Sequence, residues 1–246
     1  MKRTSAHSPM CDCTPWGVRI PRRAASDLVA LVLLFNLALG FVAMCANAAG
    51  PPKPLKIVAF GDSLTAGYLL PPPEAFPAQL EKALHARGHA VEIANAGVSG
   101  DTTSGGLARF SWAIPEGTDA VILELGANDA LRGIDPKVAR TNLDRLLGEI
   151  SKRGVPVLLA GMKAPRNWGD AYATEFDAIF PELAQKHGAL LYPFFLDGIV
   201  LDAKLNLGDG LHPNGPGVAV IVERILPLAE QLLEQARKRV VVPSRS

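Results

Sequence analysis

Three residue types in this 246-residue chain have the spacing that nucleophilic catalysis requires. Asp209 and His212 lie in the string DGLHP at residues 209–213, and Ser63 lies far upstream in the string GDSL at residues 61–64. A serine hydroxyl is a weak nucleophile until a base takes its proton, and an imidazole oriented by a carboxylate is a common base. The pattern predicts an acyl-enzyme on Ser63, with His212 as the base and Asp209 orienting the ring.

Each of these residues also has an ordinary structural explanation. Serine beside glycine and aspartate is common in turns, and an aspartate shortly before a histidine can cap a helix. Three other histidines, His85, His89 and His187, are expected at helix ends on the surface. His212 is the best candidate for the base, because it follows an aspartate in a glycine- and proline-flanked loop that can fold the carboxylate back onto the ring.

An acyl-transfer site also needs hydrogen-bond donors aimed at the oxygen that becomes negatively charged. We expect three donors: the side-chain amide of Asn128 and the backbone N–H groups of Gly100 and Ser63. Gly100 has no side chain to keep a substrate away from its N–H. Asn128 could instead satisfy a buried loop, and Gly100 could serve only to form a turn.

Short apolar runs alternate with segments of helical period along the chain after residue 54. The runs contain few polar residues, which is typical of parallel strands covered on both faces. The expected strands are residues 56–60, 91–95, 120–125, 156–160 and 189–194, and the expected helices are residues 75–87, 103–113, 137–152, 171–186 and 217–237. Repeated alternation predicts an α/β protein, a three-layer α/β/α sandwich around a parallel sheet.

The polar candidates follow the carboxyl ends of the first three expected strands, where open α/β sheets bind their ligands. Asp62, Asp101 and Asp129 fall at the same edge. Clustered carboxylates can bind a divalent cation, so a metal-dependent phosphoesterase is an alternative. Only one histidine is well placed there, however, and aspartates often hydrogen-bond loop backbone. We therefore expect no metal and no cofactor.

The first 48 residues are expected to lie outside the folded domain. Arg19, Arg22 and Arg23 precede an apolar stretch at 28–45, and the string ANA at 46–48 has the form of a signal-peptide cleavage site. The stretch is also long enough to remain as a membrane anchor, which would be the only membrane contact. Both interpretations export the domain, to the bacterial periplasm or the medium, or hold it at the inner membrane.

The remaining boundaries follow from composition. Residues 49–54 are rich in proline and glycine and are expected to form a linker, residues 55–239 form the domain, and residues 240–246 form a flexible tail. Residues 1–48 hold five of the 25 basic residues, two of the 24 acidic residues and all three cysteines. The rest of the chain has a net charge near −2, which gives no sign of a nucleic-acid partner, and it has no cysteine for a disulfide, a thiolate zinc site or a nucleophile.

Four short motifs resemble, in order, the sequence blocks of the SGNH (GDSL) hydrolase family. They are GDSL at 61–64, SGDT at 99–102, GAND at 126–129 and the pair Asp209 and His212. The strings AFGDSLTAGY (59–68), ELGANDALRG (124–133) and GMKAP (161–165) look like the branch of bacterial arylesterases, acyl-CoA thioesterases and lysophospholipases. The resemblance extends over residues 55–233.

This resemblance implies a flavodoxin-like fold whose five parallel strands have the order 2-1-3-4-5. It implies a catalytic triad of Ser63, Asp209 and His212, and an oxyanion hole built from Ser63, Gly100 and Asn128. It also implies small acyl esters, thioesters or lysophospholipids as substrates.

The segments 130–134 and 162–170 are expected to flank an acyl pocket. Its candidate lining residues are Leu131, Ile134, Met162, Pro165 and Trp168. Ordinary loop packing explains these apolar residues equally well. A non-catalytic binding module of the same fold is the remaining alternative, and the sequence leaves the acyl length and the oligomeric state open.

Overall fold

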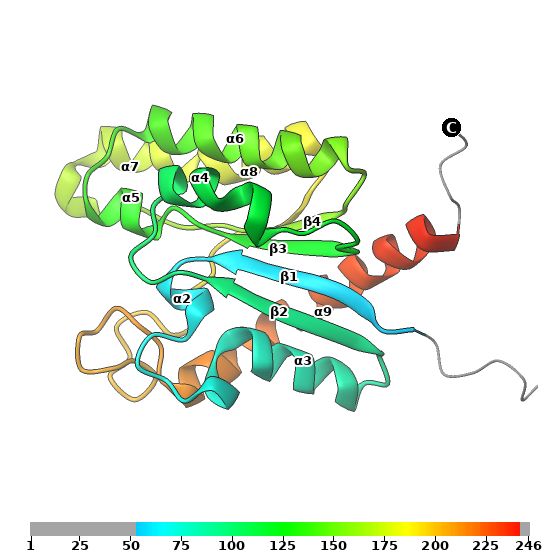
Figure 1. The fold of residues 1–246 in the computed structure, drawn as a ribbon. Coiled ribbons are helices and arrows are strands. Elements are labelled where there is room, and N and C mark those ends of the chain that lie inside the picture. Colours follow the sequence, from blue (N-terminus) through cyan, green and yellow to red (C-terminus); the bar gives the residue numbers. More distant parts are fainter. Residues whose placement is uncertain (1–52, 242–246) are drawn as a thin grey trace, which may run out of the picture. The chain divides into compact units, whose positions relative to one another are not determined.

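A computed structural model describes residues 53–241, in which a parallel sheet lies between two layers of helices (Figure 1). The strands are β1 (Leu55–Gly61), β2 (Val91–Gly97), β3 (Ala120–Glu124), β4 (Val157–Ala160) and β5 (Leu190–Tyr192). Their order is β2-β1-β3-β4-β5, and all neighbouring pairs are parallel. The predicted flavodoxin-like sandwich and its strand order are confirmed.

The helices cover both faces of the sheet. Figure 1 shows α4, α6, α7 and α8 on one side and α3 and α9 on the other. The helical elements are α2 (Ser63–Ala66), η1 (Pro72–Glu74), α3 (Phe76–Ala86), α4 (Thr103–Ala113), α5 (Ala127–Leu131), α6 (Pro136–Lys152), η2 (Arg166–Trp168), α7 (Asp170–Asp177), α8 (Ile179–His187) and α9 (Gly215–Val241).

Local sequence explains why these elements form. All five residues of β3 are buried, because helices exclude water from both of its faces. Helix α6 begins where the side chain of Asp135 accepts a hydrogen bond from the N–H of Lys137, with Pro136 at the first helical position. It buries a stripe at helical spacing that includes Leu143, Leu146, Leu147 and Ile150.

The prediction of one helix over residues 171–186 is wrong. The segment forms α7 and α8, which meet at Ala178. Pro181 has no N–H to donate to the carbonyl of Asp177, and its ring would clash with that carbonyl in a continuous helix. The strand expected at 189–194 is also shorter, Leu190–Tyr192, and Pro193 follows it directly.

The last helix is longer than expected. Helix α9 runs to Val241, so residues 240 and 241 belong to it and not to a tail. Residues 242–246 lie outside the described part, as do the expected leader at 1–48 and most of the linker. Within residues 53–241 no helix is long and apolar enough to cross a membrane.

Glycine at the end of β2 lets the strand approach the short helix that follows β1. A Cβ atom on Gly97 would lie 2.3 Å from the backbone nitrogen of Ala66 and 2.8 Å from the carbonyl oxygen of Asp62. Real Cβ atoms do not come this close to backbone atoms, so α2 is seated directly on β2. This contact fixes the position of Ser63, the first residue of α2.

Gly97→Ala should therefore push α2 away from the sheet. We expect the free energy of unfolding to fall by about 1–3 kcal/mol, as for other overpacked sites. Gly148→Ala in α6 is the matched control, because its Cβ would meet only His187 at 3.9 Å. In the middle of a helix this control change should raise stability by about 0.5–1 kcal/mol. Urea denaturation of both variants checks the pair, and equal effects would contradict the contact.

Candidate active site

The structure brings Ser63, His212 and Asp209 into one hydrogen-bonded chain. Ser63 Oγ lies 2.9 Å from His212 Nε2, across 149 positions of sequence. His212 Nδ1 lies 2.7 Å from Asp209 Oδ2. Ser63 begins α2 after β1, whereas the other two side chains come from the loop between β5 and α9. This order of groups can move the serine proton to the imidazole and stabilise the imidazolium that results.

The turn that carries Asp209 holds its carboxylate in the charged form. Asp209 Oδ1 accepts from the backbone N–H groups of His212 at 3.0 Å and Leu211 at 2.9 Å. These backbone hydrogen bonds and the contact with the His212 ring lower the pKa of Asp209 to about 2. Gly210, at φ 68°, supplies the left-handed residue that the turn needs.

Neighbouring segments fix the imidazole ring from two sides. The carbonyl of His212 accepts from the N–H of Leu207 at 2.8 Å, and Asn206 pairs with Pro213 in an antiparallel bridge. The ring of Tyr68, just after α2, is tilted against the imidazole with ring centroids 4.5 Å apart. The base is therefore held by the same segment that carries the nucleophile.

The three expected oxyanion donors follow the carboxyl ends of β1, β2 and β3. Ser63 is the first residue of α2, so its N–H has no acceptor within the helix. Asn128 Nδ2 donates to Asp62 Oδ2 at 3.1 Å, which leaves its second N–H available. Gly100 lies in the turn after β2 at φ 83°, and its carbonyl accepts from Arg132 Nη2 at 2.9 Å.

The aspartates at this edge have structural partners. Asp62 Oδ1 caps α2 through the N–H of Leu64 at 3.0 Å, and Asp129 accepts from the backbone and hydroxyl of Thr103 at 2.8 and 2.6 Å. Asp101 differs from the expected backbone role, because it forms an ion pair with the side chain of Arg109 at 2.6 Å. Residues 53–241 contain no group of three or more histidine, cysteine, aspartate or glutamate side chains that could hold a metal ion.

An apolar cavity of ≈ 390 Å³ opens beside Ser63 and His212. Of the expected lining residues, Leu131, Met162 and Pro165 line it. Further lining residues come from the loop after β5, and they include Phe194, Leu196, Val200, Leu201 and Leu211. The sequence did not single these out, because nothing in a loop sequence says which of its apolar residues face inward.

Two expected lining residues are not part of this cavity. The indole N–H of Trp168 donates to the carbonyl of Ala130 at 2.9 Å, and its ring covers the backbone at Gly133. Ile134 offers its carbonyl to the hydroxyl of Tyr172 at 2.8 Å. Both residues brace the loop after α5 from outside the cavity, so the prediction that they line it is corrected.

The model of the GDSL-like lipase/acylhydrolase family matches residues 59–220 of this chain. The chain belongs to that family. An arylesterase of Vibrio mimicus is 39% identical over 184 residues, which cover 74% of this chain and 90% of the relative. The thioesterase 1/protease 1/lysophospholipase L1 of Escherichia coli K12 is 35% identical over 159 residues, which cover 64% of this chain and 75% of the relative.

A solved structure agrees with these sequence relatives. The crystal structure of AlinE4, an SGNH-hydrolase family esterase, is 44% identical and covers 75% of this chain and 99% of its own, with a TM-score of 0.63. The predicted membership in the SGNH (GDSL) hydrolases and the predicted class, a serine ester hydrolase, are confirmed.

Two buried ionisable residues of this hydrolase were not predicted from the sequence. Arg109 of α4 donates to the carbonyls of Gly61 and Ala96, each at 2.8 Å, and its guanidinium lies 4.1 Å from the ring centroid of Phe60. It therefore ties α4 to the ends of β1 and β2. An arginine in an amphipathic helix gives no sign in the sequence that it points inward.

Glu124, the last residue of β3, is the second. It is completely buried, and its Oε2 accepts from the Thr65 hydroxyl at 2.7 Å and the Asp62 N–H at 3.3 Å. Burial, together with the nearby charge of Asp62, raises the pKa of Glu124 well above its ordinary value. A glutamate that ends an apolar run is the only signal that could have drawn attention to it.

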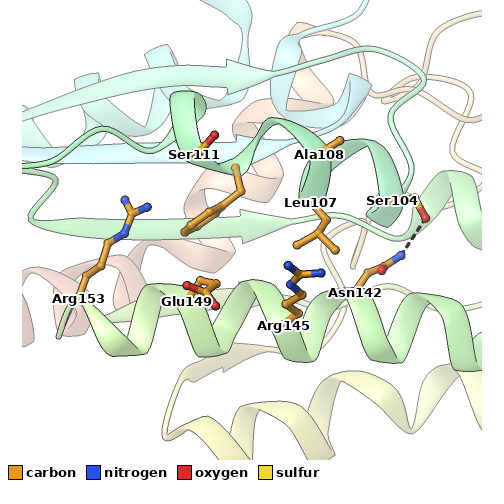
Figure 2. Close-up of a pocket in the computed structure, with 9 residues that line it drawn as sticks. Ser104, Leu107, Ala108, Ser111, Asn142, Arg145, Glu149 and Arg153 are labelled. Carbon is orange, nitrogen blue, oxygen red and sulfur yellow. Dashed lines mark hydrogen bonds between the residues drawn. The ribbon is translucent and has the colours of Figure 1, made fainter.

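A second hollow, of ≈ 750 Å³, lies between α4 and α6 (Figure 2). It is lined by Ser104, Leu107, Ala108, Phe110, Ser111, Asn142, Arg145, Glu149 and Arg153. Asn142 donates to the Ser104 hydroxyl at 2.9 Å, and Arg153 donates to the carbonyl of Ile114 at 2.7 Å. None of the predicted site residues lines this hollow.

The burial of Asp62 should appear in the pH dependence of stability. Burial raises the pKa of Asp62 from 3.8 to about 6, so between these values the folded protein binds more protons than the unfolded chain. The free energy of unfolding therefore falls as the pH rises through this window. The share of Asp62 is about 3 kcal/mol, from about 1.4 kcal/mol for each pK unit.

Asp62→Asn should remove the contribution of Asp62 to this pH dependence. The measured quantity is the difference between the free energies of unfolding in urea at about pH 4 and about pH 7. Asp144→Asn is a control that should leave this difference nearly unchanged, because Lys186 and His187 lower the pKa of Asp144 below 3.8, outside the window from about pH 4 to about pH 7. The stability that Asp144 gives is present above its unfolded pKa and is lost as the pH falls. An Asp62→Asn variant with the pH dependence of the wild type would show that this carboxyl is not buried as described.

Proposed function

We propose that this chain hydrolyses carboxylic esters and thioesters through an acyl-enzyme on Ser63. The hydrogen-bonded chain from Ser63 through His212 to Asp209, which opens into an apolar cavity, carries the proposal. A nucleophile, a base and an orienting carboxylate at hydrogen-bond distance are what acyl transfer requires.

The first half of the reaction acylates the serine. His212 Nε2 takes the Ser63 proton while Oγ attacks the acyl carbonyl carbon. The oxygen of the tetrahedral intermediate accepts from the N–H groups of Ser63 and Gly100 and from the side chain of Asn128. When the intermediate collapses, the imidazolium of His212 protonates the leaving alcohol or thiol, and the acyl group stays on Ser63.

The second half releases the acid. His212 takes a proton from a water molecule, and the resulting hydroxide adds to the acyl carbonyl carbon. The same donors hold the second oxyanion. The bond to Ser63 Oγ then breaks, the proton on His212 returns to that oxygen, and the carboxylic acid leaves the unchanged enzyme.

The cavity indicates an apolar acyl group. Its lining is mostly apolar, and the exposed side chains of Leu131, Val200, Leu201 and Leu211 surround its opening. Aryl esters, acyl thioesters and lysophospholipids all have an apolar part that fits such a cavity. The names of the relatives, an arylesterase and a thioesterase/lysophospholipase, support the same substrate classes.

We also propose that the domain is exported, on the basis of the apolar stretch at 28–45 and the string ANA at 46–48. Cleavage there would give a mature chain that begins at Ala49. Mass spectrometry of the protein recovered from the periplasm of a bacterial host checks this. A full-length chain that stays with the inner membrane would indicate a retained anchor.

Ser63→Ala should abolish turnover of p-nitrophenyl esters. Loss of a serine nucleophile lowers kcat by roughly 10⁴-fold or more, because only binding and the oxyanion donors remain. A serine-directed phosphonate should add to wild-type Ser63 and fail to label the variant. Ser111→Ala, an exposed serine of α4, is the matched control and should keep full activity.

Two other outcomes would favour the alternatives. If Ser63→Ala kept turnover and a chelator abolished it, a metal-dependent phosphoesterase would be the better description. If the wild type were inactive on a broad ester panel and did not react with phosphonate, the domain would be a binding module.

Leu131→Trp should shorten the acyl chains that the enzyme accepts. Leu131 is half exposed on α5 and lines the cavity, so a larger ring fills the cavity without disturbing the core. Each methylene that loses its place costs about 0.8 kcal/mol, or about fourfold in kcat/KM. Val138→Trp, on the exposed face of α6 outside the cavity, is the control. A series of p-nitrophenyl esters of increasing chain length measures the shift, and an unchanged preference would place the acyl group elsewhere.

A further inference from the structure

Two carboxyl groups lie together beneath the nucleophile. Asp62 directly precedes Ser63, and Glu124 stands opposite Gly61 in the pairing of β1 with β3. Both side chains are 0% exposed. Among the ion pairs of residues 53–241, neither group has a lysine, arginine or histidine partner within 4.0 Å. The two groups therefore share a buried space without a cation between them.

The oxygens of the pair have unequal surroundings. Asp62 Oδ1 accepts from the N–H of Leu64 at 3.0 Å, and its Oδ2 accepts from Asn128 Nδ2 at 3.1 Å. Glu124 Oε2 accepts from Thr65 Oγ1 at 2.7 Å and from the Asp62 N–H at 3.3 Å. Glu124 Oε1 is buried and accepts no hydrogen bond from the described part of the chain. It is the one oxygen of the four that is free to carry a proton.

Elementary electrostatics decides which group is charged. Two carboxylates that touch in a medium of low dielectric constant cannot both be ionised. Asp62 has donors on both oxygens, which favour the anion, whereas Glu124 has donors on Oε2 alone and its buried Oε1 has none. The pKa of Glu124 is raised well above its ordinary value by burial and by Asp62, and a hydrogen bond from Glu124 lowers the pKa of Asp62.

We propose that Glu124 is a positioning residue of the hydrolytic site, a neutral carboxylic acid that donates its proton to the Asp62 carboxylate and thereby holds the Asn128 amide and the first turn of α2 in place. The proposal rests on the proposed function of Ser63 and Asn128. Glu124 touches neither substrate nor nucleophile; it acts on the Asn128 amide through Asp62, and its Oε2 also accepts from Thr65 of α2.

The consequence for the oxyanion hole follows from the two bonds of Asp62. One of them fixes the rotation of the Asn128 amide, so that its second N–H is left for the oxyanion. The other caps α2, where the free N–H of Ser63 lies. One charged carboxylate therefore sets two of the three donors. A proton on Asp62 Oδ2 would remove the acceptor of the Asn128 bond and release the amide.

Among the described residues, the other charged and titratable groups near the pair do not supply the hydrogen bond that we assign to the Glu124 proton. Arg109 of α4 approaches, but its guanidinium is used by Asp101 and by the carbonyls of Gly61 and Ala96. His212, from the loop after β5, faces Asp62 and favours its charged form. From α2 and α5, the groups that face the pair are neutral, namely Thr65 and Asn128.

Two substitutions at Glu124 separate a neutral acid from an anion. Glu124→Gln keeps a neutral donor of the same shape, so kcat should stay within about threefold of the wild type and the acid limb of kcat/KM should not move. Glu124→Leu removes the donor, together with the oxygen that accepts from Thr65 and from the Asp62 N–H. Its kcat should fall by about tenfold or more, KM should change little, and the acid limb should move to higher pH as the pKa of Asp62 rises.

A spectroscopic signature tests the proton directly. In infrared difference spectra near neutral pH, the wild type should show the carbonyl stretch of a buried protonated carboxylic acid, and Glu124→Gln should lack it. If that band were absent from the wild type, or if Glu124→Gln moved the acid limb to lower pH, Glu124 would be an anion and the proposal would be wrong. The infrared band and the acid limb of Glu124→Gln test the proposal even if Glu124→Leu fails to fold.

Two controls isolate the claim. Leu123→Ala, also buried in β3, should lower thermal stability without changing kcat. If Glu124→Leu behaved in the same way, Glu124 would serve the core alone and the proposal would be overturned. Ser63→Ala in the same assay separates this inference from the proposed function, because active Ser63→Ala protein would contradict the function itself.

Discussion

The hydrogen bond between Ser63 and His212 depends on the parallel arrangement of the sheet. Parallel strands all end at one edge, so the loops after β1, β2 and β3 meet there although they are far apart in the chain. The loop between β5 and α9 reaches the same edge and brings its imidazole to 2.9 Å from the serine. Such a distance leaves no room for a shift of the kind that overpacking at Gly97 would cause. The close approach of Gly97 in β2 to α2 therefore helps to keep Ser63 at hydrogen-bond distance from His212.

The carboxyl groups at this edge of the sheet differ in how far they are buried. Asp209, at the surface, is stabilised as an anion by backbone N–H groups and is always ready to balance an imidazolium. Asp62, beneath the serine, is an anion that burial disfavours and hydrogen bonds favour. Glu124, also fully buried, has hydrogen-bond donors on Oε2 but none on Oε1. The same residue chemistry therefore serves as a charge partner near water and as a proton-bearing brace within the protein.

Much of this organisation could be predicted from the sequence. The strands are short apolar runs, and the predicted catalytic residues lie in motifs of a few residues, so both are local features. The pairing of strands and helices that are distant in sequence is not a local feature. That Glu124 stands opposite Gly61 follows from the pairing of β1 with β3, and that Arg109 reaches Gly61 follows from how α4 packs. Trp168 and Ile134 lie near lining residues in sequence, yet neither lines the cavity, and the Trp168 indole is hydrogen-bonded to the carbonyl of Ala130 instead.

Two non-glycine residues with positive φ lie in the loops after α2 and β5. Leu69 and Leu201 have φ angles of 57° and 62°, and they are the non-glycine residues with positive φ among those described. Each such residue costs of order 1 kcal/mol, and both side chains are largely exposed. Leu69 follows Tyr68, which contacts His212, and Leu201 lines the cavity. The unfavourable conformations thus fall outside the sheet and the helices, in two loops, of which one contacts the imidazole and the other lines the cavity.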